Sequence, residues 1–282
     1  MYEICAARQH FGQGAPRFFF YDTYPANMNT NLTNTIYKLP AITLLFWIMK
    51  ICATTLGETA GDLLSMTLDI GYAASSAVLL AAFVVTLVFQ MRSRAYHPFL
   101  YWGVILSTST AGTTMSDFMD RTLGLGYATG SAILLGSLIA VLSIWWLLER
   151  SLSVNNIKSF RAELFYWIAI LVSNTLGTAL GDFLADDSGL GFFGGAVLIG
   201  GVLAVIVLAT YFTKISKTAL FWAAFVLTRP FGATMGDVLT KMPEKGGLGF
   251  GTIGSSAVLA VILVAVILYT MRREPLKNPK DC

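Results

Sequence analysis

The stretch Gly177-Thr-Ala-Leu-Gly-Asp182 closes a long apolar run, and its pattern of glycine, three residues, a small residue and aspartate occurs four times. The other copies are Gly57-Glu-Thr-Ala-Gly-Asp62, Gly112-Thr-Thr-Met-Ser-Asp117 and Gly232-Ala-Thr-Met-Gly-Asp237. After each copy come a short turn that ends in glycine and an aromatic residue, and then a second apolar run. Self-similarity at this scale is typical of a repeated supersecondary unit. The sequence therefore predicts four two-helix repeats.

The composition indicates a membrane protein. Apolar residues make up 55% of the 282 residues and charged residues only 12%, about half the usual share in soluble domains. Several apolar runs approach or exceed the roughly 20 residues that cross a bilayer as a helix. We therefore expect an all-α membrane protein with eight transmembrane helices, at about residues 40–66, 72–91, 98–121, 127–149, 163–185, 191–213, 218–241 and 249–271.

The positive residues predict the orientation of these helices. Lys and Arg gather after the second, fourth, sixth and eighth helices, whereas the opposite turns contain most of the aspartates outside the motif. The positive-inside rule then places both termini and all links between repeats in the cytoplasm. Each repeat leaves and returns on the same side, so the four repeats are parallel and pseudo-symmetric about the membrane normal.

The chain divides into five segments on this basis. Residues 1–38 form a cytoplasmic tail, 39–149 hold repeats one and two, 150–162 are a cytoplasmic link, 163–271 hold repeats three and four, and 272–282 are a second cytoplasmic tail. The spacing of the motif aspartates, 55, 65 and then 55 residues, favours two halves. Met28 begins a plainer lead-in to the first helix, so residues 1–27 are either a true tail or precede the real start of the protein.

Several functional classes lack their signatures. The three cysteines show no Cys-x-x-Cys spacing, and both histidines lie outside the apolar runs, which excludes haem held by two intramembrane histidines. No nucleotide-binding, Ser-His-Asp or His-Glu-x-x-His pattern is present. We expect no enzymatic activity, no cofactor and no nucleic-acid partner.

The motif aspartates are the main functional candidates. An ionised carboxylate at the centre of a bilayer costs at least about 2.5–3.5 kcal/mol, so Asp62, Asp117, Asp182 and Asp237 call for partners. In one interpretation the four acids converge on a polar cavity in the outer half of the membrane and bind a cation or relay protons. In the other, each acid is held structurally, by amides at the start of the returning helix or by hydroxyls such as those of Thr55, Thr110 and Thr175.

Four polar residues break the symmetry of the repeats. Glu58 lies one turn from Asp62 on the same helix face, so these two acids could share a cation, a metal ion included, or a proton. Asn174 adds a polar position to the third repeat, and we include it in the candidate binding site. Arg229 is predicted to be a counter-charge that pairs with one of the motif acids. Lys50 either snorkels to the membrane surface or faces the cavity as a second internal base, and its depth favours the cavity.

The small residues of the motif predict close helix packing. Small residues four apart let two helix backbones touch inside a membrane. We expect this role for Gly57, Gly61, Gly112, Ser116, Gly177, Gly181, Gly232 and Gly236.

At the four Gly-x-x-x-small-Asp copies the chain resembles a family of bacterial integral membrane proteins with internal repeats, over most of residues 40–271. This resemblance implies the fold and a membrane location but no ligand. The string Glu58-x-x-Gly61-Asp62 also resembles the Glu-x-Gly-Asp motif of cation/manganese exchangers, with one residue more and in a single copy. Those exchangers use inverted repeats, so this second resemblance implies a cation and nothing further.

The functional prediction is a secondary transporter of the bacterial inner membrane, for a cation such as a divalent metal or for a small solute coupled to protons. Its expected partners are the bilayer, that cation or solute, and other copies of the chain in a homo-oligomer. The alternative is a membrane scaffold or regulatory subunit that transports nothing and uses the aspartates as structural caps.

Overall fold

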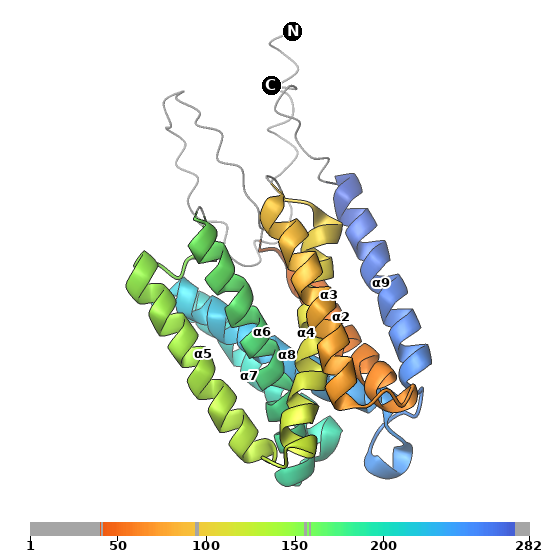
Figure 1. Ribbon diagram of the computed structural model, residues 1–282. Helices are drawn as coiled ribbons and strands as arrows, with labels where there is room; N and C mark the ends of the chain where they lie inside the picture. Colours follow the sequence, from red (N-terminus) through yellow and green to blue (C-terminus); the bar gives the residue numbers. More distant parts are fainter. Residues whose placement is uncertain (1–39, 41, 94–95, 155–156, 158, 274–282) are drawn as a thin grey trace, which may run out of the picture.

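The computed structural model describes residues 40, 42–93, 96–154, 157 and 159–273, and these are almost entirely helical (Figure 1). The two predicted tails therefore lie largely outside the described residues. Eight long helices follow one another in the described part, two in each repeat. They are α2 (Leu44–Asp62), α3 (Tyr72–Arg92), α4 (Pro98–Asp117), α5 (Tyr127–Glu149), α6 (Phe160–Asp182), α7 (Gly191–Phe212), α8 (Lys217–Thr240) and α9 (Thr252–Arg273).

Local sequence signals explain where these helices begin and turn. The hydroxyl of Thr43 accepts a hydrogen bond from the Phe46 amide at the start of α2, and Pro98 opens α4, where its missing N–H does no harm. In three repeats the first helix continues past the motif aspartate as one π-helical turn: η1 (Leu63–Thr67), η2 (Phe118–Thr122) and η4 (Phe183–Asp187). Gly71 and Gly126 then end the turns with φ of 81° and 72°, which glycine adopts without strain.

The first helices of the four repeats form a closed ring. These inner helices pack in the order α2, α4, α6, α8 and back to α2. The second helices, which we call the outer helices, pack on the outside, each mainly against the inner helix of the next repeat (Figure 1). Thus α3 lies on α4, α5 on α6, α7 on α8, and α9 closes the cycle on α2. The longer link between repeats two and three leaves this cyclic order intact.

Buried polar and charged residues gather inside this ring, and the outer helices expose apolar residues outward. Among the described residues, five helices are long and apolar enough to cross a membrane: α3, α5, α7, α9, and α6 with the turn that follows it. Each of the outer helices α3, α5, α7 and α9 exposes most of its apolar side chains. The inner helices α2, α4 and α8 have lower hydropathy because they contribute buried Thr, Ser, Lys, Arg and acidic side chains.

The motif glycines hold the inner helices together. A Cβ atom added to Gly57 would overlap Ser109 Cβ and lie 3.0 Å from the Ser109 backbone carbon, so α2 and α4 touch through their backbones. The first glycine of each motif makes the same contact with the next repeat, in the pairs Gly57–Ser109, Gly112–Asn174, Gly177–Arg229 and Gly232–Thr54. The second small residue adds contacts in the pairs Gly61–Thr113, Gly181–Ala233 and Gly236–Glu58, and Ser116 is also buried.

We predict that Gly57→Ala destabilises the protein by about 1–3 kcal/mol, because the new methyl group overlaps α4. The matched control is Gly103→Ala in helix α4, where an added Cβ meets nothing within 4 Å. This change should leave stability unchanged or raise it by up to about 1 kcal/mol through helix propensity. Thermal unfolding of the purified protein in detergent compares the two variants. Equal changes in stability would contradict a close backbone contact at Gly57.

Candidate functional site

Equivalent residues of the four inner helices line the ring axis. On each helix these residues are about one turn apart. Residues spaced by four lie on the same side of a helix, and on α2 this side carries Phe46, Lys50, Thr54, Glu58 and Asp62, all buried. The other inner helices repeat these positions, so the axis consists of stacked layers of four residues. From the helix starts to the motif, the layers are Phe46, Tyr101, Tyr166 and Phe221; Lys50, Ile105, Ile170 and Phe225; Thr54, Ser109, Asn174 and Arg229; Glu58, Thr113, Thr178 and Ala233; and Asp62, Asp117, Asp182 and Asp237.

The four motif aspartates meet at the end of this axis. Two bases bridge them in pairs. Arg121 Nε lies 3.0 Å from Asp117 Oδ1, and its Nη2 lies 3.4 Å from Asp182 Oδ2. Lys241 Nζ lies 3.0 Å from Asp62 Oδ2 and 3.2 Å from Asp237 Oδ1. Each base therefore joins the aspartate of its own repeat to that of the next.

The structure does not use these aspartates as helix caps. The residues before α3, α5 and α7 are Gly71, Gly126 and Leu190, and no side chain caps these three helix starts. The threonines proposed as alternative partners also point elsewhere. Thr55, Thr110 and Thr175 donate their hydroxyl hydrogens to backbone carbonyls of their own helices. In the described structure the four aspartates therefore contact bases.

Arg121 and Lys241 are the last residues of two predicted helices, and the sequence analysis assigns them no role in the site. A signal was present: both bases follow a motif aspartate by four residues, which puts them on the same helix face. The same position is Met66 in the first repeat and Asp186 in the third. Bases occur only in alternate repeats, and each one reaches across to the repeat that follows.

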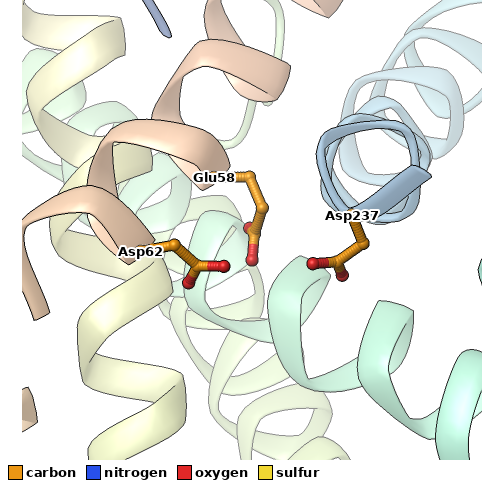
Figure 2. Close-up of side chains that lie close together, drawn as sticks. All are labelled: Glu58, Asp62 and Asp237. Carbon is orange, nitrogen blue, oxygen red and sulfur yellow. The ribbon is translucent and has the colours of Figure 1, made fainter. Parts of the chain in front are cut away.

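Glu58, Asp62 and Asp237 form the tightest group of acids. One carboxylate oxygen from each lies within 4.8 Å of the other two, and all three residues are buried. Figure 2 shows the three side chains pointing toward one another, two from α2 and one from α8. Three carboxylates at this spacing could hold a cation, and hard cations such as Ca²⁺ or Mn²⁺ favour oxygen ligands. The Lys241 ammonium already contacts two of them.

Arg229 is an internal counter-charge, but its partner differs from the one we expected. Its Nη1 lies 3.0 Å from Glu58 Oε2, so it pairs with Glu58 and not with a motif aspartate. Its Nη2 donates to the hydroxyls of Thr113, at 2.6 Å, and Thr178, at 2.7 Å. These hydroxyls also lie 3.1 Å from Glu58 Oε2. Four inner helices thus meet in one network, and Ala233 leaves room for it.

Lys50 and Asn174 lie deeper on the axis, away from the aspartates. Asn174 donates its amide hydrogens to the hydroxyls of Thr108 and Ser109, at 2.8 and 3.2 Å, so the structure does not bring it to the carboxylates. Lys50 is fully buried, and its Nζ lies 4.1 Å from the centre of the Phe225 ring. Asn174 lies about one helical turn from the level of Glu58 and Lys50 about two turns, both toward the helix starts.

The axis holds one more acid than base. Its acids in the described structure are Glu58, Asp62, Asp117, Asp182 and Asp237, and its bases are Lys50, Arg121, Arg229 and Lys241. If all nine groups are ionised, the net charge is one negative. A column of buried charges with a net negative value attracts a cation or a proton.

The same four-part division emerges from comparison with known protein families. A family model described as Repeat of Unknown Function (DUF347) matches the chain at residues 45–96, 100–151, 165–216 and 220–275. The chain belongs to this family. Each DUF347 match covers most of one inner helix and the outer helix after it, which confirms the four predicted repeats. No curated protein and no solved structure matches the chain.

We predict that Glu58→Gln alone or Arg229→Met alone destabilises the protein by about 3–5 kcal/mol, because each leaves an uncompensated buried charge. The double variant should recover a large part of that loss, since no unpaired charge remains. Unfolding of the two single variants and the double variant in detergent gives the coupling free energy. Additive losses would contradict a direct Glu58–Arg229 pair.

Proposed function

We propose that this DUF347 protein is an integral membrane transporter that carries a small cation or a proton along the axis of its inner ring. In this proposal all eight long helices cross the bilayer and the ring axis follows the membrane normal. The excess of Lys and Arg in the links between repeats supports cytoplasmic termini and four parallel repeats. The apolar surfaces of the outer helices support burial in lipid. A bacterial inner membrane is the proposed location, by resemblance.

One observation carries the choice of a cation: five carboxylates line a single buried axis and outnumber its bases by one. The ammonium of Lys241, held between Asp62 and Asp237, shows the kind of charge that this position accepts. Lys241 keeps 22% of its side chain exposed and Arg121 keeps 33%. Both bases therefore lie at the open end of the axis, where a free cation could displace the charged group of either side chain.

Asp62, Asp237 and Glu58 are the proposed binding residues, with Asp117 and Asp182 in the same layer as Asp62. A monovalent cation or proton restores neutrality on the axis with Lys241 in place. A divalent metal at Glu58, Asp62 and Asp237 requires Lys241 to leave. Asn174 has no part in binding in this proposal, and no enzymatic reaction or cofactor is assigned.

The second candidate is a scaffold or regulatory subunit. One observation favours it: each motif aspartate contacts Arg121 or Lys241, so part of its charge is compensated without any ligand. The scaffold explains less well why four acids and two bridging bases are gathered inside one ring, because an apolar axis packs a membrane bundle without that cost.

We predict that Asp62→Asn and Asp237→Asn each lower cation or proton flux about tenfold or more, since a lost interaction of about 1.4 kcal/mol changes a binding constant tenfold. The measurement uses the purified chain in liposomes, with trapped fluorescent indicators for H⁺, Na⁺ and Mn²⁺. Asp69→Asn is the matched control, because Asp69 is exposed and its φ of 54° also suits asparagine. Unchanged flux in both axial variants would favour the scaffold.

We also predict that Lys241→Met tightens the binding of the transported cation about tenfold or more, because the tethered ammonium no longer competes for Asp62 and Asp237. Stabilisation of the purified protein against heat by Na⁺ or Mn²⁺ measures this affinity. Lys214→Met, at an exposed position after α7, is the control and should bind cations like the wild type. Weaker cation binding in Lys241→Met would contradict the competition.

A further inference from the structure

Lys50 is the one axial base in the described structure without a carboxylate partner. Arg121 and Lys241 each bridge two aspartates, and Arg229 pairs with Glu58. The side chain of Lys50 is fully buried, and its Nζ has no hydrogen-bond partner among the described residues. Its own layer is otherwise apolar, with Ile105, Ile170 and Phe225.

A fixed positive charge is poorly stabilised in this place. The face of the Phe225 ring offers a cation–π contact worth about 0.5–2 kcal/mol, whereas burying an ion without a partner costs several kcal/mol. The guanidinium of Arg229 stands in the next layer and repels a second cation. An amine can meet these conditions by giving up its proton, which a guanidinium cannot do. Lysine at this position therefore suits a group that exchanges a proton.

Groups able to pass a proton lie on both sides of Lys50. Toward the motif, the Oδ1 atom of Asn174 is buried without a partner in the described structure, and Glu58 follows in the next layer. Toward the helix starts, the hydroxyls of Tyr101 and Tyr166 are 2.8 Å apart and buried. Titratable side chains therefore lie on both sides of Lys50, and the layer of Thr54, Ser109, Asn174 and Arg229 separates it from Glu58.

The tyrosine pair lies where the axis is sealed. Tyr101 and Tyr166 share their layer with Phe46 and Phe221, and a small cavity of about 10 Å³ beside this layer is lined by all four rings together with Pro40, Ile42 and Val154. A hydrated metal ion is larger than this space, whereas a proton needs only hydroxyl groups or single water molecules. The closed aromatic layer therefore favours a proton over a metal at this end.

The surroundings of Lys50 contain few other titratable groups. Helix α8 contributes Arg229, α4 contributes Tyr101 and α6 contributes Tyr166. Helix α2 itself contributes Glu58 and the buried thiol of Cys52. The buried side chains that the described part of α9 contributes are Ser255, Ser256, Leu263 and Ile267, none of which is charged.

We propose that the Lys50 amine takes up and releases a proton during each transport cycle, which makes the proton the coupling ion or the transported ion. The step is a proton exchange. An N–H bond forms at Lys50 as an O–H bond of a hydroxyl in the intervening layer, such as that of Ser109, breaks, and this hydroxyl regains a proton as the O–H bond of an axial carboxylic acid breaks and leaves a carboxylate. The ammonium then gives a proton to a tyrosine oxygen as that tyrosine releases its own hydroxyl proton toward the helix starts, and Lys50 returns to the neutral amine. This inference rests on the proposed transport function and names its ion.

Three variants of the full chain test the proposal in liposomes with a trapped pH-sensitive dye and a clamped membrane potential. Lys50→Met removes the exchangeable amine, and Lys50→Arg fixes the positive charge. Both should lower proton flux about tenfold or more, the loss that corresponds to about 1.4 kcal/mol. Lys50→His restores an exchangeable group with a lower pKa. It should retain flux, with the optimum moved to lower pH, which a purely structural role would not produce.

The outcomes separate this inference from the proposed function. Wild-type flux that survives in Lys50→Met would overturn the inference, and so would wild-type behaviour of Lys50→Arg, which would indicate a fixed charge or an anion site. Loss of flux in all three variants while they unfold like the wild type would also overturn it, because the exchangeable histidine would then rescue nothing. If the wild type carries no proton or cation at all, the transport proposal itself fails. Should Lys50→Met not fold, the comparison of Lys50→Arg with Lys50→His still decides.

Discussion

The close approach of two helix backbones at each motif glycine is the contact on which the rest of this structure depends. At Gly57 and its equivalents, the missing side chain lets the inner helix of one repeat touch that of the next. Four such contacts close a ring. Once the ring is closed, the residue after each glycine and the aspartate four residues later must face the axis. The glycines thus determine where the charged side chains go, as well as how tightly the helices pack.

Ring closure also explains how so many charges can be buried together. Three of the four axial bases reach across a boundary between repeats: Arg121 joins repeats two and three, Lys241 joins repeats four and one, and Arg229 reaches Glu58 from repeat four. Asp62 and Asp182 take their base from the preceding repeat, so the full ionic network forms only in the complete ring. The departures from fourfold symmetry on the axis give it one excess acid and one base, Lys50, without a carboxylate.

Much of this fold could be predicted from residue types and their spacing. Four copies of Gly-x-x-x-small-Asp between apolar runs predict the helices and the repeats, and the small residues predict the seams. The partners of the charged residues were harder to predict, because they depend on the order of helices around the ring. Arg229 pairs with Glu58 since α8 and α2 are neighbours in the closed ring, although 171 residues separate these two side chains. The sequence places Arg121 and Lys241 at the ends of predicted helices. Their role in bridging two aspartates becomes clear only from their contacts with the next repeat.

The most direct test concerns the packing of each outer helix against the inner helix of the next repeat. Ser256 Oγ of α9 lies 2.8 Å from Thr59 Oγ1 of α2, whereas Ser76 of α3 occupies the equivalent position in the same repeat as Thr59. In a background where Cys5, Cys52 and Cys282 are alanine, cysteines at positions 59 and 256 should form an intramolecular disulfide, which needs Cβ atoms about 3.5–4.5 Å apart. The pair at positions 59 and 76 should stay reduced under the same mild oxidation. A disulfide between 59 and 76 in place of the one between 59 and 256 would mean that each hairpin packs on itself, and the ring with its charged axis would be contradicted.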